Sequence, residues 1–391
     1  MTHPHPRWLV LTALSLVALN LRIALSSVPT LTADIQAATG WSSAAIGALT
    51  TIPVVCMGAF ALLVPRIAER IGRRHTVAAA LLLLTVALAM RLASTVPGVL
   101  PVSVFLAGVG IALAGGLVPK VVREQLPSNV GAAPGLWTAA MMSGAALGGA
   151  LTVPVAEATG SWTVALAIWA VPAAIALVVW WILEGGGEAH TRDPAASVRV
   201  RELPWRDRRA WSLTLYLTMN SIVFYTALAW LAPSFVDRGW SQADAGFLLG
   251  VFTASQIVAA LFMPWLAERA PARRLLYAGT LAVVLVTVLA VGWIPSTLTV
   301  LVVVLFGAAL GGGFAMGLAL LSEYAADGNA STRLTAMAFS VTYLTASLGP
   351  LVAGALLDAY DSWGVVFAML ALACAVQFAT IPALRRSVRI S

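Results

Sequence analysis

One positively charged residue, Arg22, interrupts an apolar run close to the start of the chain. If that run forms a helix from Trp8 towards Val28, Arg22 lies about 21 Å along it, at a rise of about 1.5 Å per residue. A charged side chain near the middle of a hydrocarbon layer costs at least about 2.5 kcal/mol, so we expect its guanidinium to face a polar cavity and to be paired. The alternative is that Arg22 extends to the outer interface or pairs with backbone carbonyls.

Arg22 has no obvious counter-ion among the acidic side chains. Each of the 16 Asp and Glu residues falls in a predicted loop or near a predicted helix end. A buried cation without a carboxylate partner favours a ligand that is anionic or strongly dipolar, because such a ligand accepts hydrogen bonds from the guanidinium. The same absence argues against a proton relay made of Asp or Glu side chains.

Several further polar or aromatic side chains lie within apolar runs and are candidates to line the same cavity. They are Asn20, Thr50, Thr51, Asn220, Tyr225, Trp230, Gln256 and Tyr343. Asn20 and Asn220 occupy near-equivalent places in two related halves of the chain, which suits a site at the interface of the halves. For each residue the alternative is a hydrogen bond between helices, which contributes only about 0.6 kcal/mol on average in a membrane protein.

The elements that carry these residues are predicted from hydropathy. Of 391 residues, 60% are hydrophobic and 10% are charged, whereas soluble domains carry about 25% charged residues. A helix needs about 20 apolar residues to cross a bilayer, and the chain holds twelve such runs. They lie near residues 8–28, 43–64, 75–93, 97–119, 135–157, 162–183, 211–232, 244–266, 275–293, 297–321, 334–357 and 363–384. These runs are too long and too uniformly apolar for barrel strands, so helices are predicted.

The basic residues gather on one side of this arrangement. All of the 23 Lys and Arg residues except Arg22, Arg91 and Arg238 fall on the side that holds both termini. The positive-inside rule makes that side cytoplasmic and predicts a multi-pass protein of the inner (plasma) membrane. The net charge of +7 then requires no nucleic acid or other acidic partner. A cleavable signal peptide is the alternative for the first run, although Arg22 would interrupt its apolar core.

The chain repeats itself at a fixed spacing. The segment Gly40-Trp41-Ser42 recurs 199 residues later as Gly239-Trp240-Ser241. Internal repeats of this kind are typical of transporters built from two related halves. We therefore predict an all-α membrane protein of twelve transmembrane helices in two pseudo-symmetric six-helix bundles, residues 1–183 and 211–391, joined by a polar cytoplasmic linker at 184–210.

A basic loop follows the second predicted span. Its sequence, Pro65-Arg66-Ile67-Ala68-Glu69-Arg70-Ile71-Gly72-Arg73-Arg74, resembles the loop signature of the major facilitator superfamily, with Pro65 and Glu69 in place of a glycine and an aspartate. A looser copy follows the eighth span. The resemblance implies a cytoplasmic gate that stabilises the outward-open state, formed by Glu69, Arg70, Arg73, Arg74, Glu268 and Arg269. The alternative is a basic loop that only sets the orientation in the membrane.

Other segments resemble the cyanate and 2-nitroimidazole transporter family within that superfamily. The segments are Leu19-Asn20-Leu21-Arg22, Leu49-Thr50-Thr51-Ile52-Pro53, Tyr225-Thr226-Ala227-Leu228, Gly311-Gly312-Gly313-Phe314 and Leu348-Gly349-Pro350. The resemblance implies a major facilitator fold and transport, by alternating access, of a small anionic or polar solute such as a cyanate-like anion or a nitroimidazole-like heterocycle. Uniport, exchange and co-transport of a protonated species stay open, as does a multidrug exporter with a mainly apolar cavity.

The sequence shows no pattern typical of an enzyme, a metal site or a cofactor site. Both cysteines, Cys56 and Cys374, lie in apolar runs where no disulfide is expected, and no metal-ligand spacing occurs. No nucleophile and base are paired in a way that predicts catalysis. We expect the partners to be a small-molecule substrate and the lipid bilayer, and we expect the chain to act as a monomer without a cofactor.

Overall fold

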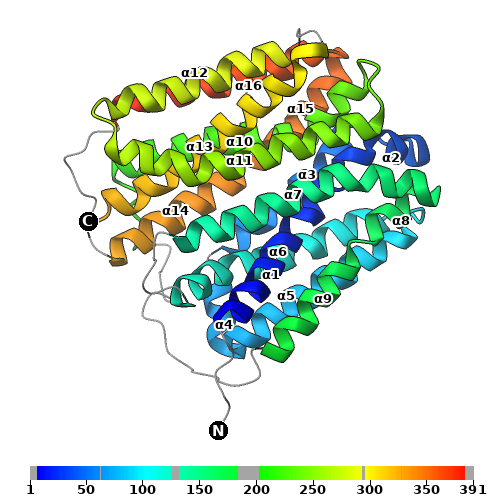
Figure 1. The fold of residues 1–391 in the computed structure, drawn as a ribbon, viewed down its shortest axis with the longest axis horizontal. Helices are drawn as coiled ribbons and strands as arrows, with labels where there is room; N and C mark the ends of the chain where they lie inside the picture. The colour runs from blue at the N-terminus through cyan, green and yellow to red at the C-terminus, as the bar shows by residue number, and fades with distance from the viewer. Residues whose placement is uncertain are drawn as a thin grey trace.

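The computed structural model describes residues 7–61, 63–125, 132–183, 202–292, 296–326 and 328–383. The first half comprises α1 (Arg7–Ser26), η1 (Pro29–Leu31), α2 (Thr32–Thr39), α3 (Ser43–Phe60), α4 (Val64–Ile71), α5 (Arg73–Met90), η2 (Arg91–Ala93), α6 (Val99–Gln125), α7 (Ala132–Thr159), α8 (Trp162–Ala167) and α9 (Ala170–Leu183). The second half comprises α10 (Arg208–Val236), α11 (Gln242–Arg269), α12 (Arg273–Val291), η5 (Ser296–Leu298), α13 (Thr299–Tyr324), α14 (Gly328–Ala346), α15 (Leu348–Tyr360), α16 (Trp363–Phe378) and η6 (Ile381–Ala383). In Figure 1 the halves form two adjacent groups of helices, and α1 begins at the end of the molecule where α16 ends.

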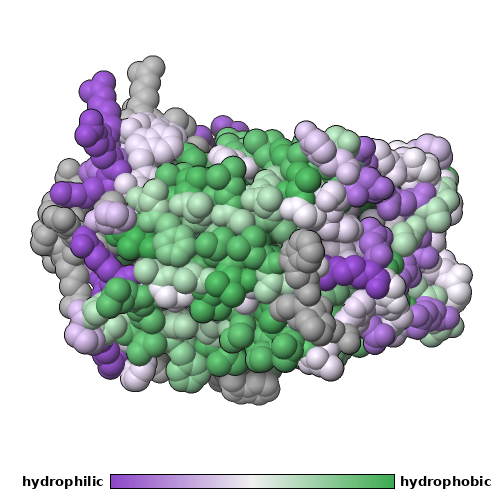
Figure 2. All heavy atoms as spheres, turned by 90° about the horizontal axis from the view of Figure 1, so that it is seen from above, coloured by the Kyte–Doolittle hydropathy of each residue, from purple (hydrophilic) through white to green (hydrophobic). Residues whose placement is uncertain are grey.

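An apolar surface crosses the middle of the molecule. Figure 2 shows, on the face it displays, a wide hydrophobic band between two hydrophilic ends. Large apolar side chains that face outwards include Leu275, Phe262 and Val286, each more than 60% exposed. In the described part of the chain, eleven helices are long and apolar enough to cross a membrane, and α16 is a shorter apolar helix of 16 residues. With α16 as the twelfth span, the predicted fold of twelve helices in two bundles is confirmed.

Some of the predicted spans are longer than expected or are broken. The first was expected to end near Val28, but beyond a turn the chain continues through η1 and α2 to Thr39. Pro29 explains the break, because it has no N–H to continue the hydrogen bonding of α1. Breaks also separate α3 from α4, α8 from α9 and α14 from α15. Most of the predicted linker lies outside the described residues, and α10 begins at Arg208, three residues before the predicted start.

Glycines allow the closest helix contacts within each half. In the first half, a Cβ atom at Gly144 of α7 would overlap the Leu19 carbonyl group of α1. In the second half, a Cβ atom at Gly307 of α13 would overlap the Phe252 carbonyl group of α11. Helices in lipid gain stability from such close backbone packing, since no hydrophobic force drives them together.

The two halves meet along two seams. In the α3–α15 seam, Gly47 lies against the Pro350 backbone, and Thr51 Oγ1 donates a hydrogen bond to the Ser347 carbonyl oxygen at 2.6 Å. In the α7–α11 seam, which is visible in Figure 1, a Cβ atom at Gly149 would lie 3.0 Å from the Gly250 nitrogen. Both seams lie towards the end of the molecule that holds α2, hereafter the outer end; the opposite end is the inner end.

We predict that Gly144→Ala lowers the free energy of unfolding by about 1–3 kcal/mol, because the new methyl group overpacks the contact between α7 and α1. Gly279→Ala is the matched control, since a Cβ atom at Gly279 of α12 meets no atom within 4 Å. It should be neutral or stabilising by up to about 1 kcal/mol, because Ala favours a helix over Gly. Denaturant unfolding of the purified protein measures both, and equal effects of the two substitutions would refute the packing argument.

Candidate functional site

Arg22 of α1 points towards the second half of the protein. Its side chain is only 7% exposed. The guanidinium carbon Cζ lies 5.2 Å from the centroid of the Phe224 ring and 5.5 Å from that of the Tyr225 ring. Both rings belong to α10, so the charge of one half rests against aromatic faces of the other. Such cation–π contacts contribute about 0.5–2 kcal/mol each, less than a buried charge costs.

The hydrogen-bonding groups of Arg22 are incompletely satisfied. Its Nε and Nη1 atoms are both buried, and neither has a hydrogen-bond acceptor. A buried donor without a partner costs about 1–3 kcal/mol, and more when it is charged. These two donors are therefore available to a ligand that brings its own acceptor atoms.

Aromatic side chains surround this guanidinium. The Tyr225 ring packs edge to face against Tyr343 of α14, with centroids 6.3 Å apart, and Tyr343 packs against Phe339 at 5.6 Å. The Tyr225 hydroxyl donates a weak hydrogen bond to the Met57 sulfur of α3, at 3.9 Å. The site is thus built by α1 and α3 from the first half and by α10 and α14 from the second. It places one buried cation beside aromatic side chains of the other half.

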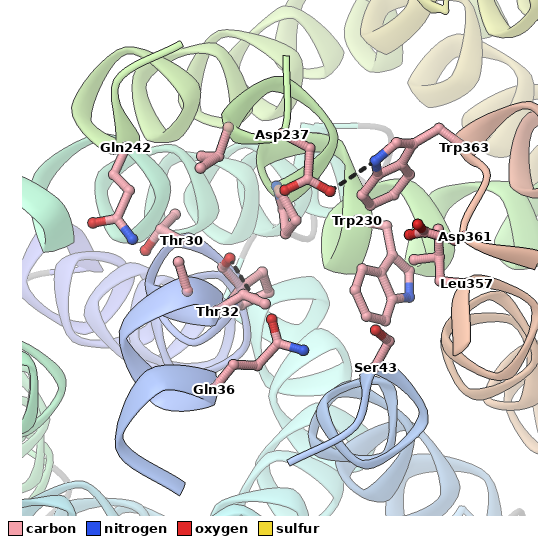
Figure 3. A pocket seen from close by; sticks show the side chains of 14 residues that line it. Thr30, Thr32, Gln36, Ser43, Trp230, Asp237, Gln242, Leu357, Asp361 and Trp363 are labelled. Atoms are coloured by element: carbon pink, nitrogen blue, oxygen red, sulfur yellow. Dashed lines mark hydrogen bonds between the residues drawn. The ribbon is translucent and has the colours of Figure 1, made fainter. Parts of the chain in front are cut away.

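A cavity of about 300 Å³ lies between the halves at the outer end. Figure 3 shows Gln36 of α2 on one side of it and the indole rings of Trp230 and Trp363 on the other. Trp363 Nε1 donates a hydrogen bond to Asp237 Oδ2 at 2.9 Å, and Trp230 Nε1 donates to the Pro350 carbonyl oxygen at 2.9 Å. Both indole donors are therefore already used within the second half.

Comparison with known proteins identifies the family. A family model described as the Major Facilitator Superfamily matches residues 10–238 and 227–389, which together cover almost the whole chain. The chain belongs to the major facilitator superfamily. It is therefore a membrane transporter and not an enzyme, as the sequence predicted.

Two of the similar transporters come from Escherichia coli (strain K12). The cyanate transport protein CynX is 32% identical over 352 residues, 89% of each chain. The 2-nitroimidazole transporter is 28% identical over 360 residues, 92% of this chain and 91% of the relative. The resemblance to the cyanate and 2-nitroimidazole transporter family is thereby confirmed.

Solved structures confirm the fold of this transporter. A point mutant of the nucleoside transporter NupG superposes with a TM-score of 0.78 at 14% identity, over 96% of this chain and all of that one. A bacterial homologue of the human lysosomal transporter Spinster, in an inward-facing and occupied conformation, superposes with a TM-score of 0.69 at 16% identity, over 98% of this chain and 95% of that one.

Three of the predicted lining residues come together in the structure. Arg22, Tyr225 and Tyr343 form the centre of the aromatic site, and the Arg22 charge lies within electrostatic reach of the Tyr343 hydroxyl. Sequence reasoning missed Phe224 and Met57, which contact Arg22 and Tyr225. The sequence offered one indication, because Phe224 directly precedes the predicted lining residue Tyr225. A Phe within an apolar run does not reveal which neighbouring helix its side chain faces.

Most of the other predicted lining residues make hydrogen bonds within the protein in this conformation. The Asn20 amide donates to the Pro172 carbonyl oxygen of α9, and the Asn220 amide donates to the Leu310 carbonyl oxygen of α13. Gln256 donates to Phe252 within α11. Thr50 is buried in α3, Thr51 bridges the halves, and Trp230 lines the outer cavity. Hydrogen bonding between helices was the open alternative for these residues, and contact with a substrate stays a prediction for them.

The basic residues of the predicted gate lie at the inner end. Glu69, Arg70 and Glu268 are exposed. Arg74 instead donates to the Trp181 carbonyl oxygen of α9 at 3.1 Å and stacks on the Trp181 ring at 4.6 Å. Arg269 stacks on Trp265 of its own helix at 4.5 Å. Arg74 and Arg269 therefore act within their own halves in this conformation.

The second copy of the basic loop makes an ion pair that was not predicted from the sequence. Arg273 makes two hydrogen bonds of 2.6 Å to the carboxylate of Glu323, joining α12 to α13. Arg274 donates to the Pro382 carbonyl oxygen at 2.9 Å, as Arg74 does to Trp181 in the first half. Arg74 and Arg274 thus make equivalent hydrogen bonds to backbone carbonyl groups at the inner ends of the two halves.

Arg91 is the second deeply buried arginine, and its surroundings differ from those of Arg22. It is 1% exposed, and it donates to Ser27 Oγ at 3.2 Å and to the Ala24 carbonyl oxygen at 3.1 Å. These acceptors lie at the end of α1, where carbonyl groups lack helical partners and a cation is favourable. Arg91 therefore stabilises the break between α1 and η1 through Nη1 and Nη2. Its Nε atom has no acceptor, as is also true of Nε and Nη1 of Arg22.

We predict opposite effects on stability for the two buried arginines. Arg91→Met leaves the Ala24 carbonyl group and the Ser27 hydroxyl without this donor, and should lower the free energy of unfolding by about 1–3 kcal/mol. Arg22→Met removes a buried charge that lacks a counter-ion, and should leave the stability unchanged or raise it. Thermal unfolding in detergent distinguishes them; strong destabilisation by Arg22→Met would mean that Arg22 is a structural residue.

Proposed function

We propose that this transporter carries a small anionic or polar solute, a cyanate-like anion or a nitroimidazole-like heterocycle, which binds the Arg22 guanidinium between the two halves. The observation that carries the proposal is the pair of buried Arg22 donors, Nε and Nη1, without acceptors. A ligand oxygen or nitrogen supplies the missing acceptor, and a hydrogen bond to a charged group contributes about 1.5–3 kcal/mol.

The aromatic rings of the second half complement such a ligand. Phe224 and Tyr225 lie beside the guanidinium, and Tyr343 extends the same surface. A flat solute can accept hydrogen bonds at its edge from Arg22 and stack its face on a ring. The names of the two Escherichia coli relatives, a cyanate transport protein and a 2-nitroimidazole transporter, agree with flat solutes that carry acceptor atoms.

We further propose that the solute crosses the membrane by alternating access. Gly47, Gly149 and Asp358 contact the opposite half at the outer end, and Arg22 and Met57 do so near the middle. Halves that are joined at their outer ends favour a conformation open towards the inner end. Rocking of the halves about the central site would expose the same Arg22 to the other side.

The exposed Glu69 and Arg70 fit this cycle. Both lie at the inner end, where they are accessible in the present conformation. When the inner ends of the halves approach, these charges come within reach of the second half and can stabilise the outward-open state. By the positive-inside rule, the inner end is cytoplasmic.

The aromatic lining also supports a second candidate, an exporter of larger apolar compounds. Phe224, Tyr225 and Tyr343 form a chain of ring contacts beside Arg22. Such a surface binds hydrophobic compounds by burial alone. The charge of Arg22 disfavours cationic drugs, so the two candidates differ in the sign of the charge they accept.

We predict that Arg22→Met abolishes uptake of labelled cyanate or 2-nitroimidazole by proteoliposomes. Arg22→Lys should retain partial uptake, because the ammonium keeps the charge but loses the planar fork of donors. Arg66→Met, which removes an exposed charge at the inner end, is the control and should transport normally. Normal uptake by Arg22→Met would remove Arg22 from the site, and a wild-type protein that moves neither solute would contradict the proposed solute class.

Ligand binding should also raise the stability of the folded protein. A free concentration of 100 times the dissociation constant stabilises it by about 2.7 kcal/mol. In a thermal-shift screen we expect small anions and flat nitro compounds to raise the melting temperature of the wild type but not of Arg22→Met. Stabilisation by bulky lipophilic cations alone would favour the exporter instead.

A further inference from the structure

A charged polar contact joins the two halves at the outer end. Asp358, near the end of α15, places both carboxylate oxygens on the first turn of α3. Oδ1 accepts a hydrogen bond from the Ser43 backbone N–H at 2.7 Å, and Oδ2 accepts one from the Ala44 N–H at 2.8 Å. Two short, charge-assisted hydrogen bonds thus join the first half to the second.

The first turn of α3 is built to receive this carboxylate. The first N–H groups of a helix have no internal acceptors, and the helix dipole favours a negative charge there. Ser42, the N-cap residue, accepts from the Ala45 N–H, and α3 has no acidic residue in its first turn. Asp358 therefore completes the cap of α3 from the other half of the protein.

The equivalent helix of the second half caps itself. Ser241 accepts from the Asp244 N–H at 3.0 Å, and its hydroxyl donates to Asp244 Oδ2 at 2.7 Å. Asp244 also supplies the acidic charge of that first turn. Glu157-Ala158 and Ser161-Trp162 recur in the second half as Asp358-Ala359 and Ser362-Trp363, so Glu157 corresponds to Asp358. Glu157 is an exposed residue near the end of α7. A carboxylate brought to the start of α11 would meet the like charge of Asp244.

The two seams are therefore closed by different forces. The α7–α11 seam contains the contacts of Gly149, Gly246 and Gly250, which are made by backbone and small side chains. The α3–α15 seam adds the Asp358 carboxylate to glycine contacts at Gly47 and Gly354. Within the described ranges, the α3–α15 seam alone gains a carboxylate contact between the halves. This contact strengthens steeply when the outer ends close, because a hydrogen bond requires close and aligned groups.

We propose that Asp358 is a latch that holds the outer ends of the halves together and biases the transporter towards the conformation closed at the outer end. The latch is one-sided: the charge acts at the α3–α15 seam, and the α7–α11 seam closes passively with it. Asp358 is exposed, so water can solvate the freed carboxylate and the exposed N–H groups when the seam opens. The latch is thus reversible, as a step in a transport cycle must be. It rests on the proposed alternating access but not on the identity of the solute.

Hydrogen–deuterium exchange of the full chain in lipid nanodiscs tests the latch. In Asp358→Ala, we expect severalfold faster exchange at the start of α3 and also at the outer ends of α7 and α11. Exchange near the inner ends of the halves should slow, since rocking closes them. Glu157→Ala, the matched acid of the other seam, should leave all of these rates at the wild-type values.

Ala45→Asp provides a second test that keeps Asp358 in place. It gives α3 an acidic residue at the place that Asp244 occupies in the first turn of α11, and it places a like charge beside the Asp358 carboxylate. We therefore expect the same changes in exchange rates as in Asp358→Ala. Unchanged exchange at α3 in both variants would overturn the latch. Faster exchange confined to the first turn of α3, without a change in α7 and α11, would mean that Asp358 only caps α3, and it would also overturn the latch. Loss of uptake in Arg22→Met is measured separately, so failure of the latch and failure of the proposed solute site are distinguishable.

Discussion

The bilayer core offers no hydrogen-bond partners, and this constraint shapes the whole molecule. The backbone satisfies it by forming helices, whose polar groups are paired within each segment. Where a span breaks, another group must serve the freed carbonyls, as Arg91 does for Ala24 at the end of α1. The Arg22 guanidinium, by contrast, keeps two buried donors without acceptors, and the proposed solute site rests on this observation.

The two halves share a backbone plan but differ in their chemistry. Arg74 and Arg274 fasten equivalent helix ends to carbonyl groups. At the outer end, the helices that are joined by an arginine differ between the halves. Arg91, at the end of α5, donates to the Ala24 carbonyl oxygen of α1, whereas Arg238, just after α10, donates to the Val291 carbonyl oxygen of α12. Burial lowers the pKa of Arg238, as expected for a cation that is partly removed from water.

Function resides where this symmetry is broken. Arg22 has no charged counterpart in the second half, which supplies aromatic rings instead. A charge from one half and rings from the other can enclose a solute that neither half could bind alone. Asp358 similarly has a counterpart in Glu157 but not an equivalent contact. Repetition therefore provides two similar halves, and asymmetry provides the contact between Arg22 and the aromatic rings at which we propose that the solute binds.

The sequence by itself determined the membrane location, the twelve helices, the two halves, the family and the buried arginine. These are local properties, because hydropathy, repeats and motifs are read along the chain without knowledge of distant contacts. The directions of side chains were decided only by the tertiary structure. Asn20 and Asn220 each donate to a carbonyl group of a neighbouring helix, and Phe224, indistinguishable in sequence from any core residue, lies beside Arg22. Asp358 was placed near a helix end, yet only the packing of α15 against α3 brought its carboxylate to two free N–H groups more than 300 residues away in sequence. A polar side chain within an apolar helix bonds to whichever partner packing brings close, and that partner is not encoded in its own segment.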